Sequence, residues 1–183
     1  MKNRQSQKGF TIIELVVVIL LLGILTATAL PRFMDVTSQA HDAVVDGVLG
    51  GMNTGVALVR ATWFAEGRNT TVANFGLGGV GVNTSGYPTG NAGAAPSSNT
   101  DCQTVYTDIL QAGGRPSIGV MSIAGTNPAT SDVTGAGYAD DFLAGHSATT
   151  CFYVYTGEGA TVSSPLLVYD TTTGTILLSS GEL

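Results

Sequence analysis

The stretch that most constrains this chain runs from residue 8 to residue 31, KGFTIIELVVVILLLGILTATALP. Between Phe10 and Leu30 it carries a single charged side chain, Glu14. About 20 apolar residues in a helix, at about 1.5 Å each, cross the roughly 30 Å hydrocarbon core of a bilayer. A carboxylate in hydrocarbon costs about 2.5–3.5 kcal/mol, so we expect Glu14 to have a partner.

The residues before this stretch indicate its orientation. Three basic side chains precede the apolar run: Lys2, Arg4 and Lys8. Positive charge beside a membrane span holds that side in the cytoplasm. The apolar run is too long for a secretory signal peptide, and no small-x-small cleavage site follows it closely. We therefore expect residues 1–9 to form a cytoplasmic leader and residues 10–31 to span the membrane.

The rest of the chain is acidic. The whole chain has 7 basic residues, of which 3 lie before Phe10. Residues 10–183 therefore hold 4 basic and 13 acidic side chains, a net charge of −9. An acidic chain without a basic patch argues against nucleic acid as a partner.

The two cysteines, Cys102 and Cys151, show neither CxxC spacing nor a neighbouring histidine. This pattern is typical of one disulfide in an oxidising compartment rather than of a metal site. The alternative is a pair of buried free thiols.

The residues around the leader boundary carry a specific resemblance. Gly9, Phe10, Thr11 and Glu14 occur in the order KGFTxxE, ahead of an apolar span that ends at Pro31. This resembles the leader and N-terminal helix of the type IV prepilins, in which a membrane peptidase cuts after the glycine and methylates the new terminal amine. The resemblance implies cleavage between Gly9 and Phe10, N-methylation of Phe10, an assembly role for Glu14, and a helix-breaking role for Pro31.

The resemblance also implies partners and a location. The partners are the prepilin peptidase, the pilus assembly machinery and further copies of this chain in a helical homopolymer. The location is the inner membrane, as a single-pass protein with a cytoplasmic N-terminus, and an extracellular pilus after assembly. Pairing Glu14 of one subunit with the terminal amine of a neighbour would favour one axial register, because an unpaired buried charge is strongly unfavourable.

Residues 32–67 predict an amphipathic continuation of the helix, with Gly67 as its stop. Four glycines interrupt the segment: Gly47, Gly50, Gly51 and Gly55. Each costs up to about 1 kcal/mol relative to alanine in a helix, so they indicate either close packing or real irregularity. We favour packing, because apolar residues continue through them at helical spacing: Phe33, Val36, Ala40, Val44, Val48, Met52, Val56, Val59 and Trp63.

Residues 68–183 are rich in Gly, Thr, Ser and Asn and predict a β domain. The strand-like runs are 71–75, 80–82, 149–156, 165–170 and 175–179, with a tight turn at 171–174 and a short helix at 103–112. These elements predict an α+β fold in which the helical residues 44–63 cover one face of an antiparallel sheet. The resemblance implies the same arrangement, the type IV pilin fold.

Side chains for chemistry are sparse. Asp132, Asp140 and Asp141 lie around a Gly- and Thr-rich loop and are candidate calcium ligands. Their spacing is not that of an EF-hand, so we prefer a solvated acidic loop without a metal. No nucleophile or oxyanion motif supports catalysis, and we predict neither an enzyme nor a cofactor.

Shorter pieces such as SGYP and CFYVYT narrow the resemblance to the mannose-sensitive haemagglutinin (MSHA) pilins. The predicted function is that of a structural pilus subunit for adhesion, attachment and biofilm formation. One alternative is a type II secretion pseudopilin or a minor pilin. A second alternative is a membrane-anchored binding module, which would retain residues 1–9.

The assigned role of Glu14 generates a test. The substitution Glu14→Ala should leave leader cleavage and membrane insertion intact but abolish filament assembly, because it removes only the counter-charge to a neighbouring terminus. Fractionation and electron microscopy of cells carrying the variant measure the three steps separately. Normal filaments from Glu14→Ala would contradict the role.

Overall fold

The computed structural model describes residues 9–73, 75, 79–91, 93–121, 139–157 and 164–180. The chain forms two compact units, one ending at Asp42 and one beginning at Ala43, and each is described by itself. The expectations for the basic leader residues and for Asp132 fall outside the described residues.

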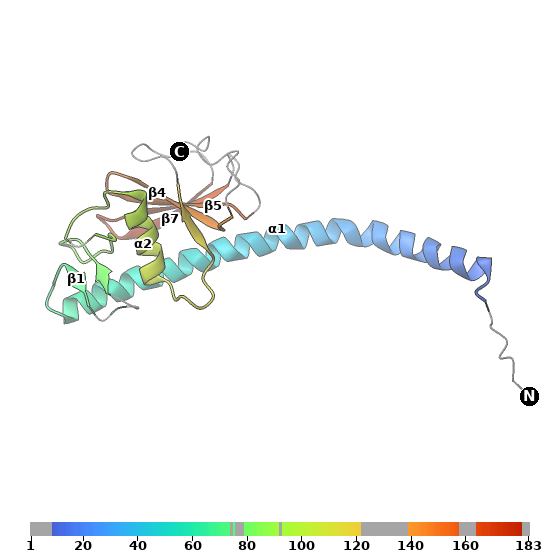
Figure 1. The fold of residues 1–183 in the computed structure, drawn as a ribbon, viewed down its shortest axis with the longest axis horizontal. Helices are drawn as coiled ribbons and strands as arrows, with labels where there is room; N and C mark the ends of the chain where they lie inside the picture. The colour runs from blue at the N-terminus through green and yellow to red at the C-terminus, as the bar shows by residue number, and fades with distance from the viewer. Residues whose placement is uncertain are drawn as a thin grey trace, which may run out of the picture. The chain divides into compact units, whose positions relative to one another are not determined.

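Helix α1 runs from Ile12 to Ala65 and is 54 residues long (Figure 1). It continues through Pro31, whose ring leaves the carbonyl of Ala27 without its usual amide donor. At its end Gly67 adopts a positive φ of 87°, and the Arg68 N–H donates to the Trp63 carbonyl at 3.0 Å. This closing bond is that of a Schellman motif, so the predicted glycine stop is confirmed.

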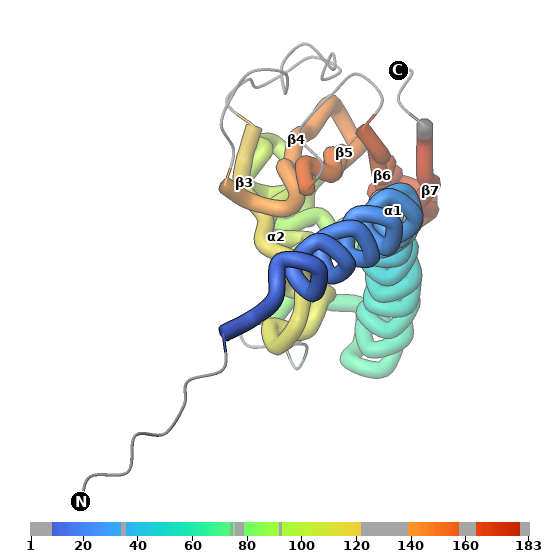
Figure 2. Tube along the Cα trace, turned by 90° about the vertical axis from the view of Figure 1, so that its right-hand side faces the viewer, coloured from blue at the N-terminus to red at the C-terminus, as the bar shows by residue number. Residues whose placement is uncertain are grey.

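The second unit holds a five-stranded sheet in the order β3, β4, β5, β6, β7 (Figure 2). The strands are Ile118–Val120, Phe142–Ser147, Thr150–Tyr155, Pro165–Asp170 and Thr175–Ser180. Two shorter strands, β1 (Thr71–Val72) and β2 (Val80–Gly81), form a separate antiparallel pair. The α+β class is thereby confirmed.

The sheet is mixed, whereas a purely antiparallel sheet was predicted. Strands β4 to β7 pair antiparallel, but β3 pairs parallel with β4, with Ile118 opposite Phe142. A parallel pair needs a crossover connection, and hairpin turn signals do not reveal one. The predicted turn between β6 and β7 is present, with Gly174 at φ 74° and its N–H bonded to the Asp170 carbonyl at 2.8 Å.

Helix α2 spans Asn99–Ile109, four residues earlier at its start than the predicted helix at 103–112. Ser98 is the N-cap and forms a capping box with Asp101, whose carboxylate accepts the Ser98 N–H at 3.1 Å. Burial opposes the charge on Asp101, but hydrogen bonds from Ser97 and Ser98 outweigh it and lower the pKa of that carboxyl. The Ser-x-x-Asp sequence, a capping box with Asp in place of the usual Glu, therefore sets the start of this helix.

One apolar core joins α1, α2 and the sheet, with the C-terminal part of α1 on the sheet as predicted. From α1 it takes Val45, Val48, Met52, Val56, Val59 and Trp63, and from the sheet it includes Phe142, Tyr153, Leu167 and Tyr169. Helix α2 also packs on the sheet, whereas the sequence predicted that α1 alone would cover it. Within residues 44–63, which were predicted to cover the sheet, the predicted stripe is wrong at one position: Val45 is 2% exposed, whereas Val44 is 38% exposed. Neighbouring residues of an α-helix point in directions about 100° apart, so when Val45 faces the sheet Val44 cannot.

The four glycines of α1 divide into two pairs. A Cβ at Gly55 would lie 2.9 Å from the Ile109 carbonyl oxygen, and one at Gly51 would lie 2.8 Å from Leu110 Cδ2. These two glycines let α1 approach the end of α2 closely, as the packing interpretation predicts. Gly47 and Gly50 have no such neighbour, since a Cβ at either would meet nothing within 4 Å.

Cys102 of α2 is bonded to Cys151 of β5, and both are fully buried. The disulfide is confirmed, and the alternative of two free thiols is wrong. The cysteines are 49 positions apart, and closing a loop of that size removes about 4 kcal/mol of chain entropy from the unfolded state in the loop-closure model.

The glycine pairs predict opposite responses to the same substitution. Gly55→Ala should lower the free energy of unfolding by about 1–3 kcal/mol, because the new methyl group overlaps Ile109. Gly50→Ala should raise it by about 0.5–1 kcal/mol, because the helix gains propensity at no steric cost. Chemical denaturation of both variants in detergent, followed by circular dichroism, measures the pair. Equal effects at the two positions would contradict the packing role of Gly55.

Candidate processing and assembly site

The start of α1 is closed by a reciprocal pair of side chains. Glu14 Oε2 accepts the backbone N–H of Thr11 at 2.9 Å and the Thr11 hydroxyl at 2.7 Å. In return the Glu14 N–H donates to Thr11 Oγ1 at 3.3 Å. Thr11 is thus the N-cap and Glu14 the third helical residue of a capping box, which satisfies donors that the first turn cannot pair internally.

The sequence predicted a partner for Glu14 only in a neighbouring subunit, whereas the structure shows one within the chain, Thr11. The Thr-x-x-Glu spacing at residues 11–14 was the available signal. Two donors use one carboxylate oxygen here, and a carboxylate has about four acceptor positions. Glu14 therefore retains capacity for a further donor, such as a terminal amine at Phe10.

Gly9 and Phe10 precede the cap and are both exposed, Phe10 to 91%. A Cβ placed on Gly9 would meet no atom within 4 Å. The backbone on both sides of the Gly9–Phe10 bond is therefore open to a peptidase, as cleavage at this bond requires. Cleavage, methylation and the assembly roles of Glu14 and Pro31 stay predictions.

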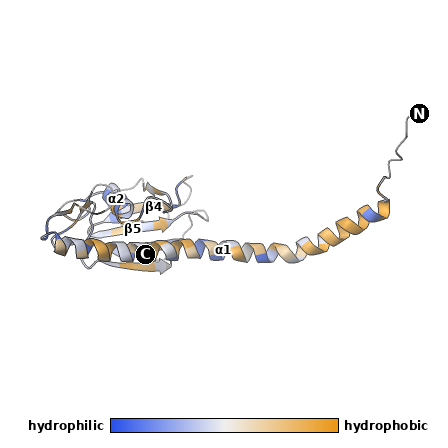
Figure 3. Ribbon diagram, turned by 90° about the horizontal axis from the view of Figure 1, so that it is seen from below, coloured by the Kyte–Doolittle hydropathy of each residue, from blue (hydrophilic) through white to orange (hydrophobic). Residues whose placement is uncertain are grey.

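The first half of α1 presents apolar side chains outward on every face. All residues from 10 to 28 are exposed, and Figure 3 shows this part of the helix as almost continuously apolar, interrupted near its start. Among the described residues α1 is long and apolar enough to cross a membrane, with a mean hydropathy of 2.7 in its most apolar window. Such a surface needs lipid or other apolar helices around it.

Comparison with known proteins finds similarity to this segment. Residues 4–30 match the model of the prokaryotic N-terminal methylation motif. The chain is 48% identical over 60 residues to the type IV narrow pilus major component PilA5 of Thermus thermophilus, covering 33% of this chain and 50% of the relative.

The N-terminal segment of this chain is similar to that of type IV pilins.

Two further relatives with fimbrial or pilin names are also similar to this chain. The chain is 33% identical over 105 residues to a fimbrial protein of Neisseria meningitidis, covering 57% of this chain and 49% of the relative. It is 38% identical over 76 residues to the type IV major alpha-pilin of Moraxella bovis, covering 39% and 48%. The chain spans about half the length of these relatives. No solved structure matches it.

The candidate calcium ligands have other contacts. Asp141 Oδ2 accepts both the N–H and the hydroxyl of Ser117, each at 2.9 Å, and the Asp141 N–H donates to Ser117 Oγ at 2.9 Å. The Asp140 carbonyl accepts the Thr156 hydroxyl. Within the described residues no three His, Cys, Asp or Glu side chains gather at metal-binding distance, and Asp132 lies outside them.

The contacts of Asp141 predict a structural role at the entry to the parallel strands β3 and β4. Asp141→Ala should lower the free energy of unfolding by about 0.5–1.5 kcal/mol, because Ser117 loses an acceptor for two donors. Ser117→Ala should cost a similar amount, and the double variant should cost less than the sum of the two. Thermal unfolding measures all three, and stabilisation of the unsubstituted chain by Ca²⁺ would show instead that the acidic loop binds metal.

Proposed function

We propose that this chain is a structural subunit of a type IV pilus that polymerises through its N-terminal helix. The observation that carries the proposal is an exposed apolar helix whose capped first turn holds one carboxylate, Glu14. The similarity to pilins over the same residues supports it.

The proposed life of the subunit has two stages. The membrane-spanning segment first anchors the chain in the inner membrane, with the leader on the cytoplasmic side. The prepilin peptidase then cuts between Gly9 and Phe10 and methylates Phe10. After extraction by the assembly machinery, the same apolar residues pack against other copies, and the disulfide-bonded β unit faces outward in an extracellular filament.

Further parts of the proposal concern what the filament does. Adhesion, surface attachment and biofilm formation follow from a long extracellular fibre with a β surface. Membership of the MSHA group rests on short sequence pieces alone. The subunit would act as a substrate and a building block and would catalyse no reaction of its own.

The mature N-terminus tests the proposal. Mass spectrometry of the membrane and surface fractions should find a chain that begins at N-methylated Phe10. Sheared surface material, labelled with an antibody to this chain, should contain long fibres under the electron microscope. Gly9→Leu, in which a bulky side chain blocks the peptidase, should retain the leader and yield no fibres.

Each other result selects a different function. An intact Met1 in the mature protein would indicate a membrane-anchored binding module. A methylated Phe10 without labelled fibres would indicate a secretion pseudopilin or a minor pilin.

A further inference from the structure

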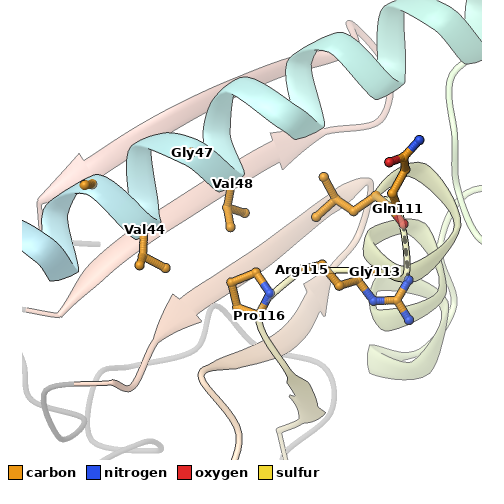
Figure 4. A pocket seen from close by; sticks show the side chains of 10 residues that line it. Val44, Gly47, Val48, Gln111, Gly113, Arg115 and Pro116 are labelled. Carbon is orange, nitrogen blue, oxygen red and sulfur yellow. Dashed lines mark hydrogen bonds between the residues drawn. The ribbon is translucent and has the colours of Figure 1, made fainter.

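A cleft of about 370 Å³ opens between α1 and the segment that follows α2. Its α1 wall is formed by Ala43, Val44, Gly47 and Val48, and its other wall includes Leu110, Arg115 and Pro116. Figure 4 shows Val44 and Val48 pointing from α1 toward Pro116. All of these residues belong to the second compact unit.

The wall opposite α1 is held in place by Arg115. Its Nη1 donates to the carbonyls of Thr107 at 2.6 Å and of Leu110 at 3.2 Å. These carbonyls end α2, where a cation is favoured by the helix dipole. The guanidinium is therefore bound within the chain, and the residues lining the cleft include no carboxylate.

The α1 wall is open because of Gly47. A Cβ at this position would meet nothing within 4 Å. Beside it Val44 is 38% exposed, although the neighbouring Val48 is 5% exposed and belongs to the core. The α1 side of the cleft is thus apolar and has room for a side chain at the surface of the helix, whereas the opposite wall includes Gln111 and Arg115 beside Leu110 and Pro116.

The chain itself supplies a suitable occupant. Its large exposed apolar side chains are concentrated at residues 10–36 of α1, and in a polymer another copy must cover them. Among them, Phe33 and Val36 are 70% and 61% exposed. Burying one such side chain in the cleft of another copy would remove its apolar surface from water.

We propose that this cleft receives a large apolar side chain from the N-terminal helix of a second copy of the chain. The inference rests on the proposed polymer and assigns one of its contacts to the second compact unit. Gly47 is the residue that keeps the receiving site open.

The test fills the cleft from the α1 side. Gly47→Leu places a side chain in the space that the neighbour would occupy, at a position where an added Cβ meets nothing within 4 Å. Gly50→Leu is the matched control, since it makes the same substitution at an equally open position of the same helix that does not line the cleft. Filament yield, N-terminal processing and thermal unfolding are measured for both variants and for the unsubstituted chain.

We expect both variants to be processed and to unfold at or above the temperature of the unsubstituted chain. Gly47→Leu should lower filament yield about tenfold or more, which is the effect of losing one buried apolar side chain. Gly50→Leu should assemble normally. Full assembly of Gly47→Leu, or equal loss in both variants, would overturn the inference.

Cysteine labelling gives a second readout that does not depend on a leucine. Both native cysteines are in the disulfide, and the described residues hold no free thiol. A Gly47→Cys subunit should react with a maleimide in detergent and be protected in filaments, whereas Gly50→Cys should react in both. Reaction of Gly47→Cys in filaments would overturn the inference. Absence of filaments from the unsubstituted chain would refute the polymer instead.

Discussion

An apolar helical surface that its own chain leaves exposed is the constraint on which the rest of this structure depends. Residues 10–28 are exposed on every face, so the chain is stable only where lipid or other apolar helices surround them. Burying such side chains contributes about 1.5–3 kcal/mol each, which is ample to hold a helix of this kind in a membrane or in a helical bundle. The acidic, disulfide-bonded second unit contributes none of this surface.

The second unit has a different problem, because its sequence is poor in charge and rich in glycine. A few specific contacts between α1, α2 and the sheet hold this unit together. Gly51 and Gly55 bring α1 against the end of α2, and Cys102 ties α2 to β5. The buried Tyr153 hydroxyl donates to the Cys102 carbonyl at 2.9 Å beside that bridge. These contacts make α2 the link between the long helix and the sheet.

The sequence was most informative where one physical requirement dominates. The long helix, its stop at Gly67, the late hairpin and the disulfide partners were all predicted from spacing and residue type. The parallel strand β3 was not, because three residues with weak alternation carry no pairing signal. The start of α2 and the internal partner of Glu14 were not predicted for another reason. Each depends on a capping box, in which a Ser or Thr pairs with an acidic residue three positions later, and neither pair was recognised in the sequence. Val45 faces the core and Val44 lines the cleft. This choice depends on the position of α2, which the periodicity of the sequence alone does not provide.

The capping box at Thr11 and Glu14 changes the energetic account of assembly. A bare carboxylate in the membrane would pull the subunit toward any available cation and make the membrane pool costly to maintain. Here two hydrogen bonds from Thr11 already satisfy one carboxylate oxygen. In the proposed polymer, joining the filament then adds a donor to a carboxylate that is already hydrogen-bonded within its own chain, rather than giving a first partner to an isolated charge. In that proposal the hydrogen bonds of Thr11 lower the cost of holding the Glu14 carboxylate in the membrane, and the terminal amine of a neighbour supplies the counter-charge that Thr11 cannot.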